Sequence, residues 1–475
     1  MIRRWNFPLC VALSLVALSL ADLCASPWAR AAEPRRMNVL FIAADDLNVD
    51  LGCYGHPLVK SPNIDRLAAR GVRFERAYCQ YALCNPTRTS LLSGRRPEVT
   101  NIMDNNKPPR TFLGPDVVFL PEYFGKQGYF TARVGKIAHV PFESAVRWDV
   151  AENAEGRGKR DNPEPVHMEG SAGAKVGWLA TDNEDADEPD GHTARRIVEL
   201  LEQNKDKPFF IAAGFHKPHE PLVAPKKYFS LYDPAKIALD AEPADDRRDI
   251  PALSLVRNRP DPVTNPEERR RLMAAYFAAI SFMDAQVGVL LDALDRLKLA
   301  DQTIVVFFGD HGWHLGEHQG LWRKTSLFEE AAHAPLIIAA PAAKRNGQAS
   351  SRPVEFLGIY PTLVELCGLP SNAGLQGKSL APLLDDPKAK WKGPAVTVLR
   401  WNGQLGKSAR TQRWRYSEWE QGKAGSELYD HRKDPHEYVN LAQDPDHAKI
   451  VARMKKMLTK ESEGLVTPTA AAAAP

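Results

Sequence analysis

The sequence predicts an α/β protein built around a large, mostly parallel and buried β-sheet. Strand-like apolar runs alternate along the chain with stretches that have helical periodicity. Three of the runs, at 38–44, 208–215 and 303–308, are almost continuously apolar. Such strands are typical of a sheet that is covered on both faces, and the alternation of strands and helices indicates that helices provide the cover.

Three longer stretches are predicted to be helices. The first begins at Ser61-Pro62, which favours a helix start, and ends at Gly71. The second, 192–204, is amphipathic, and the third, 266–297, carries apolar side chains at helical spacing. These helices stand between the apolar runs, as the predicted fold requires.

A break rich in proline, lysine and aspartate at 385–393 indicates a domain boundary. Short strand-like runs follow at 395–400, 413–416 and 427–430, and a final helix is expected after them. The last residues are rich in alanine. We therefore predict a large domain over 37–385, a small C-terminal subdomain over 390–465 and a disordered tail over 466–475.

The bulk composition is that of a globular protein. The chain has 475 residues, of which 44% are hydrophobic and 25% charged, so it is long enough for one large domain or two unequal ones. The formal net charge is only +3. We therefore expect neither nucleic acid nor a charged membrane surface as a partner.

The N-terminus has the features of a secretory signal peptide over residues 1–31. Arg3 and Arg4 precede an apolar stretch at 11–20, and Ala29-Arg30-Ala31 offers a small-x-small cleavage site. The apolar stretch is too short for a stable membrane span. We expect an exported protein, periplasmic or secreted, with no membrane span after cleavage.

Cysteine is scarce for an exported protein. Removal of the signal peptide leaves Cys53, Cys79, Cys84 and Cys367. Four cysteines in a chain of this length do not make a disulfide framework, although one bridge is possible. Most of these side chains are expected to be buried thiols.

Three of the predicted strands end in residues that can bind ligands. Asp45 and Asp46 follow the first strand, His216 follows the second, and Asp310 and His311 follow the third. One aspartate after a strand is more often a turn or helix cap. Three such ends predict a site at the carboxyl edge of the sheet, where open α/β folds bind ligands. The three aspartates suit a hard cation, Ca²⁺ or Mg²⁺, rather than Zn²⁺.

The run from Cys84 to Thr89 places a thiol two residues before Pro86 and four before Arg88. Proline fits the first position of a helix, so a helix is expected over 87–93 with Cys84 at or just before its N-terminus. An anion is favoured there, and Arg88 lies close enough to reach the same place. The alternative is a buried structural cysteine beside an ordinary capped helix.

This motif, Cys-x-Pro-x-Arg followed by Leu-x-Gly-Arg, resembles the signature of the type I sulfatases. Thr87 and Ser93 differ from the commonest version of the signature. The resemblance extends from residue 38 to residue 430. It implies an alkaline phosphatase/sulfatase-like α/β/α sandwich that ends in a small antiparallel sheet with a helix. It also implies that a formylglycine-generating enzyme converts Cys84 to formylglycine, whose hydrated aldehyde is the nucleophile of the family.

The resemblance also implies one divalent cation, usually Ca²⁺, with Mg²⁺ possible. Its ligands in this sequence are Asp45, Asp46, the converted Cys84, Asp310 and His311. The Asp–His pair at 310–311, in place of Asp–Asn, resembles the iduronate-2-sulfatase branch of the family.

Four further residues receive roles from the resemblance and accompany Arg88 in the predicted site. Lys136 and Lys324 match the lysines that hold sulfate oxygens, and His139 and His216 match the catalytic histidines. A lysine and a histidine three residues apart are, on their own, more often ordinary surface residues. His219 is the weaker candidate beside His216.

The implied function is an exported sulfatase that acts on sulfated glycans, with a sulfated uronic acid favoured. Trp313, His314 and Trp322 are expected to wall a sugar pocket. One alternative is another hydrolase of the alkaline phosphatase superfamily, a phosphodiesterase or phosphonate monoester hydrolase. Another is a secreted glycan-binding relative without turnover.

Overall fold

The computed structural model describes residues 36–153, 166–169, 175–255 and 265–463, together with Met1. Residues 2–31 of the predicted signal peptide and the predicted tail at 466–475 lie outside these ranges. The described residues from Met37 onward belong to one structural unit. The division into 37–385 and 390–465 stays a prediction.

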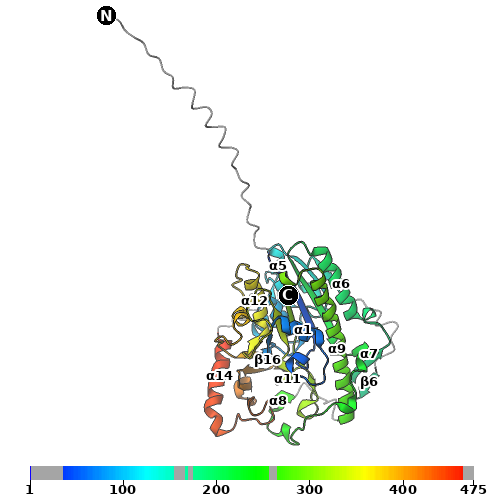
Figure 1. Cartoon of the computed structure of the whole chain (residues 1–475). Coiled ribbons are helices and arrows are strands. Elements are labelled where there is room, and N and C mark those ends of the chain that lie inside the picture. The colour runs from blue at the N-terminus through cyan, green and yellow to red at the C-terminus, as the bar shows by residue number, and fades with distance from the viewer. Residues whose placement is uncertain (2–35, 154–165, 170–174, 256–264, 464–475) are drawn as a thin grey trace, which may run out of the picture. The chain divides into compact units, whose positions relative to one another are not determined.

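An eight-stranded sheet forms the centre of this unit, as the apolar runs predict (Figure 1). β1 lies between β8 and β10 and is parallel to both, and β4 and β5 extend the parallel part beyond β8. β13 is antiparallel to β10 and β2, so the sheet is mixed but mostly parallel. In spatial order the strands are β14 (Ala349–Ser350), β2 (Val72–Phe74), β13 (Leu336–Ala339), β10 (Thr303–Gly309), β1 (Asn38–Asp45), β8 (Phe209–Pro218), β4 (Phe130–Gly135) and β5 (Val150–Glu152).

Helices cover both faces of the sheet. Successive side chains of β1 enter two different cores, with Leu40 and Ile42 in one and Val39 and Phe41 in the other. The first core is closed by α1 (Pro62–Arg70), α6 (Pro189–Asn204) and α9 (Pro266–Arg296), and the second by α2 (Cys84–Ser93), α5 (Leu120–Lys126) and α12 (Ile359–Leu366).

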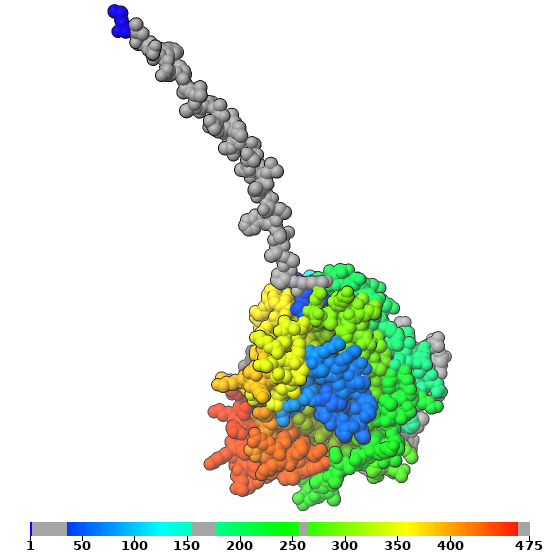
Figure 2. All heavy atoms as spheres, in the orientation of Figure 1, coloured from blue at the N-terminus to red at the C-terminus, as the bar shows by residue number. Residues whose placement is uncertain are grey.

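Segments far apart in the sequence form a continuous surface over this sheet. Figure 2 shows an early segment, coloured blue, between green and yellow segments from the middle of the chain. This matches the packing of α1 against α9 and β13. The α/β/α arrangement therefore agrees with the predicted fold class.

The C-terminal part is a four-stranded antiparallel sheet with a helix. Its strands pair in sequence order and share a core with the helix. The second strand was not predicted, because its run Gln-Leu-Gly-Lys-Ser-Ala-Arg is only weakly apolar. The elements are β16 (Ala395–Trp401), β17 (Gln404–Arg410), β18 (Trp414–Trp419), β19 (Ser426–Asp430) and α14 (Ala448–Ser462).

The remaining strands and α-helices are short. They are the strands β3 (Ala77–Tyr78), β6 (Val166–Glu169), β7 (Lys175–Thr181), β9 (Leu222–Pro225), β11 (His314–Leu315), β12 (Trp322–Arg323) and β15 (Val354–Glu355), and the helices α3 (Pro97–Thr100), α4 (Pro109–Leu113), α7 (Lys226–Phe229), α8 (Ala252–Leu255), α10 (Glu317–Gly320), α11 (Glu329–Ala332) and α13 (Ala381–Asp385).

Among the described residues, one helix is long and apolar enough to cross a membrane by composition. This is α9, and 89% of its most apolar window is buried inside the protein. It is the central helix of a core in this structure. The four cysteines that follow the predicted signal peptide are all free thiols, and only Cys53 is partly exposed.

Candidate active site

The parallel strands bring their carboxyl ends to one edge of the sheet, and the aspartates meet there. Asp45 is the last residue of β1, and Asp310 directly follows β10. The backbone N–H of Asp46 donates to Asp310 Oδ1 at 3.0 Å, and the three carboxylates are at most 1% exposed. Asp46 has φ +61°, and Tyr276 supports this turn by donating its hydroxyl to the Asp46 carbonyl at 2.7 Å.

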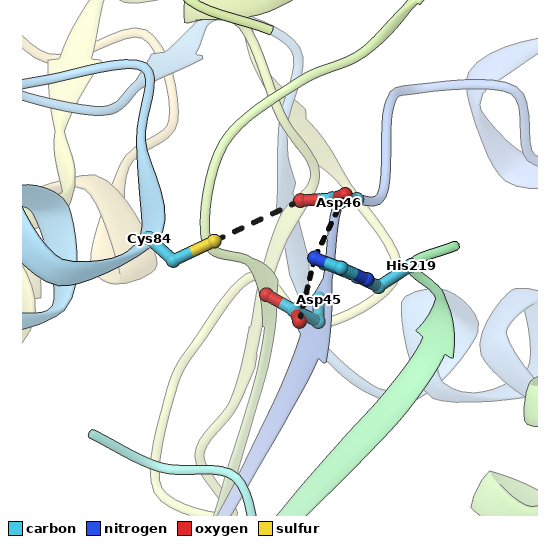
Figure 3. Close-up of side chains that lie close together, drawn as sticks. All are labelled: Asp45, Asp46, Cys84 and His219. Atoms are coloured by element: carbon cyan, nitrogen blue, oxygen red, sulfur yellow. Dashed lines mark hydrogen bonds and ion pairs between the residues drawn. The ribbon is translucent and has the colours of Figure 1, made fainter. Parts of the chain in front are cut away.

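Cys84 faces these carboxylates from the start of α2. Its Sγ lies 3.9 Å from Asp46 Oδ1 (Figure 3) and 3.4 Å from His311 Nε2. The helix begins at Cys84 itself, so Pro86 is its third residue and the expectation that it is the first was wrong. Burial, reinforced by the charge of Asp45, raises the pKa of the Cys84 thiol. An unmodified Cys84 is therefore a protonated, unreactive thiol at neutral pH.

His311 presents one ring nitrogen to the same cluster. Its Nδ1 lies 3.0 Å from the carbonyl oxygen of Gly312, which can only accept a hydrogen bond. A hydrogen bond to this carbonyl requires a proton on Nδ1, and the other ring nitrogen, Nε2, faces Cys84 and Asp46. This orientation suits a metal ligand.

Arg88 joins the two aspartate strands. Its Nη2 donates to Asp45 Oδ1 at 3.1 Å, and its Nε donates to Asp310 Oδ2 at 2.8 Å. Its Nη1 donates to the carbonyl oxygens of Lys136 and Ile137. At 2% exposure this guanidinium is positioned to hold the carboxylates and the Lys136 backbone rather than the substrate.

Two lysines approach the aspartate pair. Lys136 makes an ion pair with Asp45, and Lys324 Nζ lies 2.7 and 2.6 Å from the two oxygens of Asp46. Burial opposes the charge of each ammonium, but the neighbouring aspartates outweigh it and raise the pKa of both lysines. Both predicted lysines are therefore placed in the site and charged.

The structure places His219 beside both Asp45 and Asp46, and His216 beside Asp45. His219 Nε2 lies 3.6 Å from Asp46 Oδ2 and 4.0 Å from Asp45 Oδ2 (Figure 3). His216 Nδ1 lies 3.9 Å from Asp45 Oδ2, and its side chain is 42% exposed. Burial lowers the pKa of His219 to about 3, with a further contribution from Lys324. The weaker of the two sequence candidates is thus the better placed to face the aspartates.

His139 lies beside the Lys136 segment and is partly buried. Burial, followed by the positive charges of Lys136 and Arg88, lowers the pKa of His139 to about 4. Its Nδ1 has no hydrogen-bond partner among the described residues. The imidazole is therefore neutral at physiological pH and able to accept a proton.

Two carboxylates that the sequence did not reveal hold these segments. Asp190 accepts the backbone N–H groups of His216 at 2.8 Å and Lys217 at 2.9 Å. Glu143 accepts the backbone N–H groups of Ile137 and Ala138, both at 3.1 Å. The only local signal is that Asp190 follows a proline at a helix start, which also describes many ordinary caps.

The expectation that three residues near the site wall a sugar pocket was wrong. Trp313, His314 and Trp322 are at most 2% exposed. Trp313 and Trp322 belong to the core beneath α9, and His314 Nε2 contacts Ser326 Oγ. Their rings are therefore packed in the protein interior and do not line a substrate pocket.

The donor set fits a divalent cation. One ligand atom from each of Asp45, Asp46, Cys84 and His219 lies within 4.8 Å of the others, and Cys84 forms a second such group with Asp310 and His311. Buried carboxylate oxygens are the ligands that hard cations prefer. The set also contains His219, which was not among the predicted ligands.

Comparison with known proteins identifies the family. The Sulfatase family model matches residues 37–369, and the model described as N-sulphoglucosamine sulphohydrolase, C-terminal, matches residues 316–464. A protein named Sulfatase from Formosa agariphila is 34% identical over 453 residues, which cover 90% of this chain and 87% of that protein. Iduronate 2-sulfatase from Homo sapiens is 36% identical over 386 residues, which cover 70% of this chain and 69% of that protein.

A solved structure shares the fold. The phosphonate monoester hydrolase of Agrobacterium radiobacter matches with a TM-score of 0.78 over 91% of this chain and 96% of that chain, at 23% sequence identity. This likeness confirms the predicted architecture and carries nothing about activity. The family match and the two relatives together show that the chain belongs to the sulfatase family and is a sulfuric ester hydrolase.

Proposed function

We propose that this protein is an exported sulfatase that removes sulfate from sulfated glycans, with a formylglycine made from Cys84 and one bound Ca²⁺. Mg²⁺ is the second candidate for the cation. The observation that carries the proposal is the convergence of three buried aspartates and two lysines on Cys84 at the edge of the sheet.

The charges of the site match the needs of sulfate ester cleavage. Bond breaking places negative charge on the sulfuryl oxygens and on the leaving oxygen, and preorganised positive charge is the largest catalytic term available. Lys136 and Lys324 would hold sulfuryl oxygens, while Arg88 keeps Asp45 and Asp310 in place. A bound divalent cation would supply further charge stabilisation and lower the pKa of the attacking hydroxyl.

Conversion of Cys84 to formylglycine would replace a protonated, unreactive thiol with a group that can act as a nucleophile. Formylglycine would supply a hydrated aldehyde hydroxyl as nucleophile in place of the thiol. His216 or Lys324 would donate a proton to the leaving alcohol, and His216 borders solvent, where a glycan can extend. His139, neutral at physiological pH, would accept a proton when sulfate is released.

Mass spectrometry of the Cys84 peptide tests the nucleophile. Protein made beside a competent modifying enzyme should show a loss of about 18 Da at Cys84, since CH₂SH is replaced by CHO. Cys84→Ala should lower kcat by about 10⁶-fold, as removal of a covalent nucleophile does. Fully active protein with only free thiol at Cys84 would contradict the proposal.

Metal removal tests the cation. Chelation should abolish turnover, and Ca²⁺ or Mg²⁺ should restore it, because three carboxylates need a hard cation. Two stoichiometric zinc ions in the purified protein would instead favour a phosphatase-like site.

A substrate series tests the glycan. The likeness to human iduronate 2-sulfatase favours a 2-O-sulfated uronic acid. We expect a higher kcat/KM for a 2-O-sulfated iduronic acid disaccharide than for sulfated N-acetylgalactosamine or a simple aryl sulfate. Preference for the neutral sugar would remove the uronate assignment and leave the sulfatase chemistry.

The same series decides between the alternatives. A phosphonate monoester or phosphodiester that turns over faster than every sulfate ester would favour the other superfamily hydrolase, and binding of glycans without turnover would favour a non-catalytic relative. Export is tested by N-terminal sequencing of the protein from the periplasm or medium, which should begin after Ala31.

A further inference from the structure

The backbone that carries Lys324 has an unusual conformation. Arg323 has φ +81° and Thr325 has φ +75°, so the residues on both sides of the lysine lie in the left-handed region. Side-chain-bearing residues seldom adopt this conformation, and a β-branched residue such as threonine does so least readily. Such a conformation persists where surrounding contacts hold it.

One carboxylate supplies such contacts. Glu220 Oε1 accepts the indole N–H of Trp322 at 3.0 Å, and Oε2 accepts Nε and Nη2 of Arg323 at 3.1 and 2.8 Å. The Glu220 side chain is 13% exposed, and Trp322 is 1% exposed. Glu220 thus binds both residues of β12, immediately before Lys324.

Glu220 belongs to the other side of the site. It follows His219 in the turn between β8 and β9, which is closed by the backbone bond from His219 N–H to the His216 carbonyl at 3.0 Å. Lys217 Nζ also donates to the Pro221 carbonyl at 2.7 Å. A movement of Glu220 would therefore displace both β12 and the turn between β8 and β9, which carries His219 and is called the histidine turn.

We propose that Glu220 is a positioning residue of the sulfatase reaction, which fastens the Lys324 segment to the histidine turn. Lys324 Nζ and His219 Nε2 both face Asp46 Oδ2, at 2.6 and 3.6 Å, although they come from the two segments that Glu220 joins. Glu220 acts through Trp322 and Arg323 and not by contact with the reacting groups. This inference rests on the proposed role of Lys324 as a sulfate-binding residue.

The geometry of the contact explains why it can fix a position. An exposed ion pair contributes little on its own, and the Arg323 side chain is 43% exposed. The two guanidinium N–H bonds, however, set an angle as well as a distance, and the buried indole N–H adds a third fixed direction. Three donors on one carboxylate define the place of β12 relative to the turn.

The test compares Glu220→Gln with a matched variant elsewhere. Asp430 in the C-terminal sheet also accepts two guanidinium bonds, from Arg413 at 2.8 and 2.6 Å, and its partner is similarly exposed at 38%. Asp430→Asn removes an equivalent charge pair from a region outside the site. Steady-state kinetics and backbone hydrogen exchange are measured on the modified, metal-loaded full-length protein.

We expect Glu220→Gln to lower kcat by about 10-fold to 100-fold, the effect of a misplaced charged group, with little change in KM. Amide exchange should increase in 316–325. Asp430→Asn should change neither kcat nor exchange in that segment. Arg323→Gln should reproduce the loss, and the Glu220→Gln/Arg323→Gln double variant should lose no more than the worse single one, because the two share one interaction.

An unchanged kcat in Glu220→Gln, unchanged exchange in 316–325, or a double variant whose losses multiply would overturn the inference. Failure of the proposed function gives a different result. In that case the wild-type protein would not turn over sulfate esters, while faster exchange in 316–325 of Glu220→Gln would still identify Glu220 as the residue that fastens this segment.

Discussion

The two lysines of the site follow residues with almost the same backbone conformation but different side chains. Gly135 precedes Lys136 with φ +79°, and Arg323 precedes Lys324 with φ +81°. At Gly135 a Cβ would overlap the carbonyl oxygen of Gly214 in the neighbouring strand, so only glycine fits. At Arg323 the side chain is accommodated and bound by Glu220.

This difference shows two ways to place a charged group. The Lys136 side is held through its own backbone N–H groups, since Lys136 N–H donates to the Gly214 carbonyl at 3.0 Å and the Glu143 carboxylate accepts the N–H groups of Ile137 and Ala138. The Lys324 side is held by side-chain bonds from β12 to Glu220. We expect the first side to be intolerant of backbone change and the second to depend on side-chain chemistry.

The largest expected effect comes from Gly135→Ala. The new Cβ would collide with backbone and lie at an unfavourable φ, so we expect a loss of about 4 kcal/mol in unfolding free energy and of most activity. Gly114→Ala is the matched control, because Gly114 has φ +77° with no atom near the added Cβ. Urea denaturation compares the two, and equal losses would mean that φ alone, not the approach to Gly214, restricts Gly135.

Substitution of the lysines sharpens the comparison at the carboxylates. Lys136→Ala and Lys324→Ala should each lower kcat by about 10²-fold, as loss of a transition-state donor does. They should differ in the effect of Ca²⁺ on Tm. Asp45 keeps Arg88 as a partner after the first change, whereas Asp46 keeps only His219 and His311 among the ion pairs of the described residues.

We therefore expect Ca²⁺ to raise the Tm of Lys324→Ala more than that of Lys136→Ala. Calorimetry with chelator and with Ca²⁺ measures both shifts, and the wild type gives the reference. Equal shifts in the two variants would mean that the aspartates share their cationic partners instead of each depending on its own.

The same comparison explains what the sequence could predict. The strand ends at Asp45 and Asp310 follow from a local pattern, an apolar run and then a polar residue, whereas Lys136 was predicted only from the resemblance to the family. Glu220 and Arg323 are 103 residues apart, so their contact leaves no periodic signal. The ends of the buried strands are therefore visible in the sequence, whereas the carboxylates that hold the lysine segments, Glu143 and Glu220, are not.

For the fold as well, elements with a clear local sequence pattern were predicted and elements without one were not. The long buried strands were predicted from their continuous apolar runs, and α9 was predicted from apolar side chains at helical spacing. The edge strands β5 and β14 are only three and two residues long, too short to show a period. The expectation that Trp313 and Trp322 line a sugar pocket was wrong for another reason. An aromatic residue near a catalytic motif can pack in the core as well as line a pocket.

One histidine on each side of the site should contribute to stability with opposite pH dependence. They are His318 on the Lys324 side and His139 on the Lys136 side. Asp246 at 2.9 Å, with Glu330 and Glu437 nearby, raises the pKa of buried His318 to about 9 despite desolvation, whereas burial lowers the pKa of His139 to about 4. A group whose pKa is raised in the folded state stabilises the folded protein fully below its unfolded-state pKa. This stabilisation is lost as the pH rises through the folded-state pKa. We expect His318 to contribute about 2 kcal/mol less stability at about pH 9 than at about pH 7.

Urea unfolding of His318→Gln and His139→Gln at the two pH values checks this. The decline between about pH 7 and about pH 9 should flatten in His318→Gln, and it should remain in His139→Gln, whose lowered pKa removes stability only as the pH falls from its unfolded value toward about 4. A decline that persists unchanged in His318→Gln would show that other groups carry it.

The smallest effect is expected at Thr325, which has φ +75° and donates its backbone N–H to the Ala82 carbonyl at 3.1 Å. Glycine adopts this φ without strain, so Thr325→Gly should gain about 1 kcal/mol from strain relief, reduced by the greater entropy of the unfolded chain. Thr325→Ala keeps a Cβ at the same φ and is the control. If side-chain bonds hold Lys324 through this strained backbone, Thr325→Gly should keep or raise Tm in calorimetry and lower kcat only a few-fold. A clear fall in Tm with Thr325→Gly but not with Thr325→Ala would mean that the left-handed backbone is not strained here, and Glu220 would then be orienting β12 without offsetting a backbone penalty.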